Sequence, residues 1–258
     1  MKQSLIEPTA RYCDTHFHLD LCDNPSEVTK AIEANNLTVF AMTNAPFVFR
    51  ASLELAQSSR RICVGLGMHP QLIARCADQM SLFRSEASRT QLIGEVGLDY
   101  QTESIDDRCL QRRIFGEILA ECDADGNKVI SIHSRRATSD VIAMIAGVNS
   151  TCILHWFSGT MRELDQAEEA GAYFSVNPSM LVTKTGRRLV ARMRRDRVLT
   201  ETDGPYVRVH NRPAGPTDVV SVVEGLADLW GEDREMVSDV IMENLTGALS
   251  SGRRNGAG

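Results

Sequence analysis

Residues 12–20 read Tyr-Cys-Asp-Thr-His-Phe-His-Leu-Asp, a short apolar run that leads directly into two histidines one residue apart. Side chains at positions i and i+2 of a β-strand point to the same side, so His16 and His18 can hold one metal ion together. Taken alone, the pair is equally compatible with two polar residues in a loop. Whether the pair binds metal depends on which other residues of the chain lie at the ends of neighbouring strands.

Eight short apolar, β-rich runs recur along the chain, with helical patterns such as 109–120, 161–170 and 217–229 between them. The runs are 12–15, 37–43, 62–66, 91–95, 128–132, 151–154, 172–176 and 197–200. They are continuously apolar rather than alternating, which is typical of parallel strands covered on both faces. Eight strand–helix units in one chain predict the α/β class and a closed (β/α)₈ TIM barrel.

The length of 258 residues matches one such barrel and leaves little room for a second domain. We therefore expect one domain over residues 1–249. The polar, glycine-rich stretch 250–258 is expected to be a disordered tail.

Several features bear on the compartment. No apolar run approaches the ~20 residues that a membrane span needs, and the first ten residues lack the apolar region of a secretory signal. The seven cysteines form no Cys-x-x-Cys pair. Cys13, Cys63 and Cys152 fall in strand-like runs, where we expect reduced, buried thiols. A cytoplasmic protein without membrane contact fits these features best.

Reactive side chains gather at the ends of the predicted strands. Five of the six histidines lie at or just past a strand end, and the carboxyl ends of barrel strands meet at one mouth, where catalytic residues lie. Each of these residues alone could be a cap or a turn former. Together they predict a two-metal centre made of His16, His18, Glu95, His133, His155 and Asp203.

The ligand types narrow the choice of metal. Imidazole and carboxylate ligands without sulfur suit Zn, Mn, Fe or Ni, and leave Mg possible where carboxylate and water dominate. Two divalent ions, with Zn, Mn or Mg as the main candidates, are the expected cofactors. Glu95 has two oxygens and could bridge the two ions.

The motifs at these positions resemble those of TatD-type metal-dependent deoxyribonucleases, in register over residues 12–249. They are Asp-Thr-His-Phe-His-Leu-Asp at 14–20, Gly-Met-His-Pro at 67–70, Gly-Glu-Val-Gly-Leu-Asp-Tyr at 94–100, Ile-His-Ser-Arg at 132–135, His-Trp-Phe-Ser-Gly at 155–159 and Glu-Thr-Asp-Gly-Pro at 201–205. The resemblance implies one metal held by His16, His18, Glu95 and Asp203, and a second held by Glu95, His133 and His155. It also implies that His69 contacts the substrate phosphate.

Residues 131–137, 174–176, 196–205 and 212–214 are similar to one subgroup, the TatD-type nuclease of the Qat phage-defence system. That resemblance implies other proteins of a Qat-type defence operon as partners, including a QueC-like protein and an ATPase. Two departures stand out. Gln71 follows the His-Pro pair where many relatives have a second histidine, and Trp156 replaces a small residue beside His155, which should narrow the pocket.

The expected reaction is hydrolysis of phosphodiester bonds in DNA, from an end as the family resemblance implies. Asp203 would orient or deprotonate the attacking water and Glu95 would hold the ions, while His69 and Arg135 would neutralise phosphate oxygens. An amidohydrolase or lactonase on the same barrel is the alternative, although such enzymes commonly bridge their metals with a modified lysine where Glu95 stands here. A scaffold that works mainly as a partner within a defence complex is a third possibility.

The net charge of −6 argues against bulk attraction to nucleic acid but leaves room for a local basic channel. Residues 184–197 hold seven cations and one acid. This run is either a solvated helix face or a patch that faces phosphate. Arg135 and Arg136 follow His133 and should lie at the mouth, with Arg208 and Arg212 on the same rim.

Overall fold

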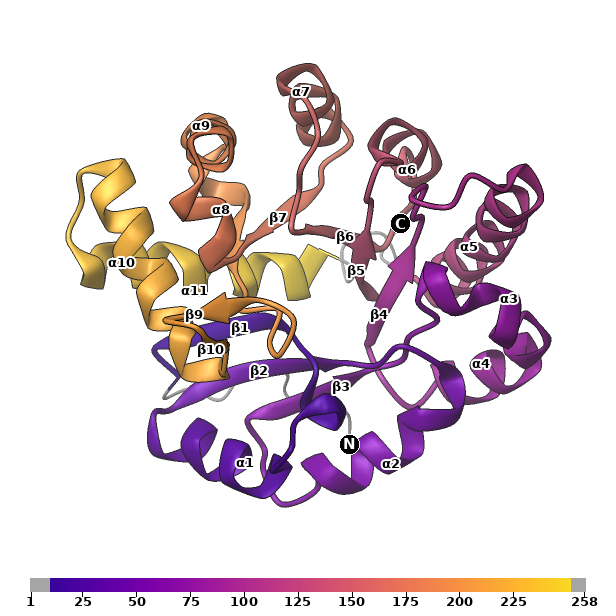
Figure 1. Cartoon of the computed structure of the whole chain (residues 1–258), viewed down its shortest axis with the longest axis horizontal. Coiled ribbons are helices and arrows are strands. Elements are labelled where there is room, and N and C mark those ends of the chain that lie inside the picture. The colour runs from indigo at the N-terminus through magenta and orange to yellow at the C-terminus, as the bar shows by residue number, and fades with distance from the viewer. Residues whose placement is uncertain (1–9, 252–258) are drawn as a thin grey trace.

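The eight apolar runs all form strands, and these follow one another around the centre of the fold in chain order (Figure 1). The computed structural model describes residues 10–251. The barrel strands are β1 (Tyr12–Phe17), β2 (Leu37–Met42), β3 (Ile62–Gly65), β4 (Leu92–Gly97), β5 (Val129–His133), β6 (Thr151–His155), β7 (Tyr173–Val176) and β8 (Val198–Thr200). All the ladders between them are parallel. The predicted α/β barrel is confirmed.

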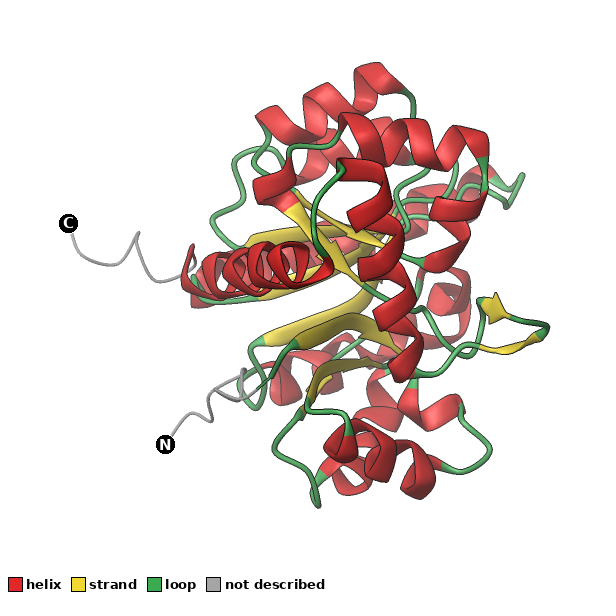
Figure 2. Ribbon diagram, turned by 90° about the vertical axis from the view of Figure 1, so that its left-hand side faces the viewer, coloured by secondary structure: helices red, strands yellow, loops and turns green. Residues whose placement is uncertain are grey.

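Helices surround the strands on the outside, so that the strands are buried on both faces (Figures 1 and 2). The helices are α1 (Pro25–Ala34), α2 (Phe49–Ala56), α3 (Ile73–Cys76), α4 (Met80–Ala87), α5 (Ile105–Asp125), α6 (Thr138–Ile145), α7 (Met161–Glu169), α8 (Pro178–Val182), α9 (Lys184–Arg192), α10 (Val219–Trp230) and α11 (Arg234–Ser251). Phe17, Phe40 and Phe174 are among the side chains that fill the core without solvent exposure. Full coverage explains why apolar residues follow one another in most of these strands instead of alternating with polar ones.

The barrel consists of two hydrogen-bonded sheets, β1–β3 and β4–β8. Where they meet at β3 and β4, Leu66 and Ile93 form an isolated parallel bridge. Just after this bridge, Gly67 lets the chain pass close to the end of β2 and to Glu95, because a Cβ atom there would lie 1.6 Å from the Thr43 carbonyl oxygen and 2.7 Å from the Glu95 nitrogen. Glu95 is thereby fixed at the barrel mouth, with its backbone N–H donating to Thr43 O at 2.9 Å.

At the other seam, β1 and β8 are joined by individual hydrogen bonds rather than by a ladder. The buried carboxylate of Asp14 accepts hydrogen bonds from the backbone N–H groups of His16 (3.2 Å) and Thr202 (3.0 Å). Beyond it, the Asp203 N–H donates to His16 O and the His18 N–H donates to Gly204 O, both at 2.9 Å. These contacts close the barrel and place the first strand end against the last.

Outside the barrel, a small hairpin of β9 (Arg208–Val209) and β10 (Arg212–Pro213) follows β8. Helix α11 ends at Ser251, so it includes the first two residues of the expected tail, and residues 252–258 lie outside the described part. The three cysteines predicted to be core thiols are free and buried. No helix within residues 10–251 is long and apolar enough to cross a membrane.

Candidate metal centre

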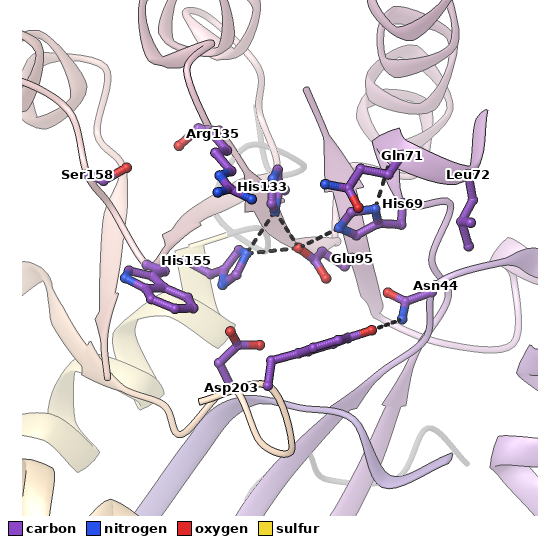
Figure 3. A pocket seen from close by; sticks show the side chains of 13 residues that line it. Asn44, His69, Gln71, Leu72, Glu95, His133, Arg135, His155, Ser158 and Asp203 are labelled. Carbon is purple, nitrogen blue, oxygen red and sulfur yellow. Dashed lines mark hydrogen bonds and ion pairs between the residues drawn. The ribbon is translucent and has the colours of Figure 1, made fainter. Parts of the chain in front are cut away.

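The six residues predicted to bind metal come from the ends of β1, β4, β5 and β6 and from the loop after β8, and the structure brings them together at one mouth of the barrel. A cavity of about 510 Å³ opens over them. Figure 3 shows the side chains of Glu95, His133, His155, His69 and Asp203 directed into this cavity. Strand-end position thus predicted proximity in space.

Glu95 lies at the centre of the cluster. Its Oε2 atom is 3.5 Å from Nε2 of both His16 and His18. Its Oε1 atom faces the opposite group, 2.7 Å from His133 Nδ1 and 2.9 Å from His155 Nε2. The two oxygens of one carboxylate therefore face two separate pairs of histidines, which is the arrangement that a ligand shared by two cations requires.

Asp203 completes the first half of the cluster. Its Oδ1 atom lies 3.9 Å from His16 Nε2 and 3.6 Å from His18 Nε2. Both of these Nε2 atoms are buried and have no hydrogen-bond partner among the described residues. A buried, unpartnered polar atom is unfavourable, so two nitrogens that converge on two carboxylates fit a site for a divalent cation.

The other ring nitrogens of these histidines are already held. His18 Nδ1 lies 3.2 Å from the backbone carbonyl of Met42, which can only accept, so Nδ1 carries a proton and Nε2 is the nitrogen left to bind a cation. His16 Nδ1 is 2.7 Å from the Ser131 hydroxyl. Such contacts fix the ring orientation that a metal ligand needs.

The electrostatics of the cluster favour a cation. Burial opposes protonation of His18, but the carboxylates of Asp203 and Glu95 outweigh it and raise the pKa of His18 to about 10. Burial alone would likewise raise the pKa of Glu95, yet His69, His155 and His133 hold that pKa well below its usual range. Glu95 therefore remains ionised and attracts positive charge, which a divalent metal ion can supply.

The second half of the cluster includes a carboxylate whose role was not predicted from the sequence. Asp99 is buried, accepts a hydrogen bond from Gln71 Nε2 at 2.7 Å and lies 3.1 Å from His133 Nε2. Burial would raise its pKa, but contacts led by His133 lower it to about 2. Asp99 was visible in the motif at 94–100, but its contact with His133 depends on the distance between two strand ends.

His69, which was predicted to contact the substrate phosphate, lies next to the metal ligands Glu95 and His133. Its Nε2 atom is 3.3 Å from Glu95 Oε1, and the donor atoms of His69, Glu95 and His133 lie within 4.8 Å of one another. The backbone N–H of Gln71 donates to His69 Nδ1 at 3.1 Å. His69 can therefore contact either a second cation or a phosphate beside it.

Glu201 is a further residue to which the sequence analysis assigned no role. It is fully buried next to His155, with its Oε1 atom 3.6 Å from His155 Nδ1. The side-chain amide of Asn177 and the backbone N–H of Trp156 both donate to that oxygen, at 3.0 and 3.1 Å. Glu201 thus holds the start of the loop after β6 and places a buried carboxylate beside His155.

The structure separates the predicted basic residues. Arg135 lines the cavity, whereas Arg208 and Arg212 do not, and Arg212 is paired with Asp218 at 2.7 Å. In the basic run at 184–197, four arginines form ion pairs with exposed or half-exposed acids outside the cavity. The run is therefore a solvated helix face.

Comparisons with known proteins show which family the chain resembles. The family model described as "TatD related DNase" matches residues 13–250. A 3'-5' ssDNA/RNA exonuclease TatD of Dickeya dadantii is 28% identical over 204 residues, covering 73% of this chain and 76% of the relative. A putative deoxyribonuclease TATDN1 homolog of Encephalitozoon cuniculi is 24% identical over 223 residues, with 75% and 80% covered. The crystal structure of YJJV, a TatD homolog from Escherichia coli K12, superposes with a TM-score of 0.83 at 21% identity, covering 93% of this chain and 98% of that one.

The family model and the relatives identify the chain as a metal-dependent hydrolase, and the histidine–carboxylate cluster at the barrel mouth fits that class. Within that class, the chain belongs to the TatD-related DNase family.

Proposed function

We propose that this chain is a DNase that hydrolyses phosphodiester bonds through a two-metal centre and works from an end of the strand. The observation that carries the proposal is the position of Glu95, whose two oxygens each face a different histidine pair. His16, His18, Glu95 and Asp203 would hold one cation, and Glu95, His133 and His155 the other. When bound, two such cations polarise the scissile phosphate and lower the pKa of a water molecule.

The chain's own groups supply the remaining steps. Asp203 faces both His16 and His18 and is placed to orient the attacking water and accept its proton. The guanidinium of Arg135 and the ring of His69 line the same cavity and would neutralise phosphate oxygens as charge builds up in the transition state.

Attack from an end is supported by the size of the site. A cavity of about 510 Å³ is in the range of small-ligand sites, which suits one nucleotide better than an intact duplex. The name of the Dickeya dadantii relative, a 3'-5' ssDNA/RNA exonuclease, points the same way for that protein.

The motifs shared with the Qat subgroup support a narrower proposal: that the enzyme acts in the cytoplasm within a Qat-type anti-phage system, with a QueC-like protein and an ATPase as partners. Affinity purification of the chain from cells that express such an operon tests this association. Recovery of neither partner would count against it.

The activity is tested with purified protein and labelled single-stranded and duplex oligonucleotides, after chelation and after addition of Mn²⁺, Mg²⁺ or Zn²⁺. We expect metal-dependent shortening from one end. Glu95→Gln should lose most of it, because a neutral amide bridges two cations poorly, whereas Glu54→Gln, an exposed position on α2, should not. Hydrolysis of lactones or amides with every nucleic acid left intact would instead identify an amidohydrolase.

A further inference from the structure

Trp156 is an exposed aromatic side chain in the cavity of the metal centre. Trp156 is 39% exposed to solvent, although its indole ring is large and apolar. Of the large hydrophobic residues that are exposed within 10–251, only Trp156 and Tyr206 line this cavity. Tyr206 already packs edge-on against His18, with ring centroids 5.1 Å apart, whereas no described ring or cation stacks on Trp156.

The backbone holds Trp156 in a fixed position. Its φ angle is +42°, in the left-handed region that a bulky residue rarely adopts. The Trp156 N–H donates to the buried carboxylate of Glu201, and the next residue, Phe157, is buried against Phe174 with ring centroids 5.3 Å apart. Backbone strain of this kind clusters at functional sites, where the surrounding structure maintains it.

The position of the indole suggests its ligand. Trp156 lines the same cavity as His155, Glu95 and Asp203, so it lies beside the cluster at which a phosphate would be hydrolysed. Arg135 and Ser158 line the same cavity and offer polar contacts to a sugar–phosphate chain. An aromatic face next to cationic and hydroxyl groups is the combination that proteins use to bind unpaired nucleotides.

We infer that Trp156 stacks on the nucleobase adjacent to the scissile phosphate, an inference that rests on the proposed nuclease function. Stacking on a protein ring requires a base that has left its own stack, so the substrate is a strand with an unpaired end. Every base offers a π-face, so recognition at this subsite tolerates any sequence. The fixed backbone means that little conformational freedom is lost when a base binds.

The test measures binding without cleavage, in an Asp203→Asn background with Mn²⁺ present. One labelled oligo-dT strand is compared with the same strand whose terminal nucleotides lack bases. We expect the intact strand to bind on the order of 5- to 100-fold more tightly, in line with base–aromatic stacking. Trp156→Ala should remove this preference, and Trp156→Phe should retain part of it. Phe47→Ala, which removes an exposed ring outside the cavity, should retain all of it.

A second readout reports on the ring directly. The chain has two tryptophans, so Trp230→Phe leaves Trp156 as the sole indole, and its fluorescence should be quenched by the intact strand and not by the strand without terminal bases. An equal preference in the Trp156→Ala protein, or no preference in the parent, overturns the inference. Cleavage by the protein with native Asp203 tests the proposed function separately: normal cleavage without a base preference refutes only the stacking, and a base preference without cleavage refutes only the nuclease.

Discussion

Replacing Arg135 by alanine should slow DNA hydrolysis far more than replacing Arg192. Both arginines are exposed, but they differ in position and in pairing. Arg135 lines the metal cavity, and its side chain forms no ion pair with any residue in 10–251. Arg192 lies on α9 outside the cavity and is bound to Asp165, Nη2 to Oδ1, at 2.9 Å. Only Arg135 has both access to the substrate and an unpaired charge.

The expected magnitudes follow from these contacts. A hydrogen bond to a charged group contributes about 1.5–3 kcal/mol, so loss of the contact between Arg135 and a phosphate should lower kcat/KM about 10- to 100-fold. Each lost phosphate contact should also flatten the log–log salt dependence of binding by about 0.7 for a single strand. The pair between Arg192 and Asp165 is solvent-exposed and contributes at most about 1 kcal/mol to stability, so Arg192→Ala should change hydrolysis by less than about twofold.

The measurement is kcat/KM and binding for both variants at several salt concentrations, with unfolding temperatures to show that both proteins are folded. Arg135→Lys is an informative third variant, because it keeps the charge but loses the planar guanidinium fork. If Arg192→Ala flattens the salt slope while Arg135→Ala leaves slope and rate unchanged, the substrate path is misplaced.

Three further predictions concern the metal centre. His16→Ala combined with His18→Ala should sharply reduce the metal retained after purification without chelator, because both unpartnered nitrogens are lost; equal metal content in parent and variant, by mass spectrometry, would contradict the site. Asp99→Asn should lower metal affinity or activity about 10- to 100-fold, the usual effect of removing a group that orients a metal ligand, since Asp99 contacts His133; unchanged metal titrations would show that the contact is dispensable. The metal-free pKa of His18 is raised to about 10, so a cation that binds at neutral pH must displace a proton from this histidine. Below pH 10, apparent metal affinity should therefore rise about tenfold for each unit of increasing pH. Calorimetric titrations in several buffers that detect no proton release would refute this.

The strands could be predicted from the sequence because the fold covers them on both sides. In β5, four of the five residues are buried, so the run is apolar except for Ser131, and its end is marked by His133. Proximity of the ligands followed from a general rule, that barrel strands end at one mouth.

Roles that depend on contacts between particular side chains could not be predicted from the sequence. Asp99 and Glu201 were visible in their motifs, but contact with His133 and His155 arises from how neighbouring strands align. For the basic run at 184–197, the sequence left open whether the charges face a phosphate or the solvent. Its charge was plain from the sequence, whereas its ion pairs with acids from α7 and α10 exist only in the folded chain.

Closure of the barrel and assembly of the metal centre depend on the same contacts. The seam between β1 and β8 has no ladder, and it is joined beside the site by Asp14 and by the backbone bond from Asp203 to His16. His16 and His18 lie on one side of that seam and Asp203 on the other. A cation held by these three side chains would therefore link the first strand of the barrel to the last. Binding that favours only the folded state stabilises it, so the centre that would carry out hydrolysis would also reinforce a seam of the barrel that has no ladder of its own.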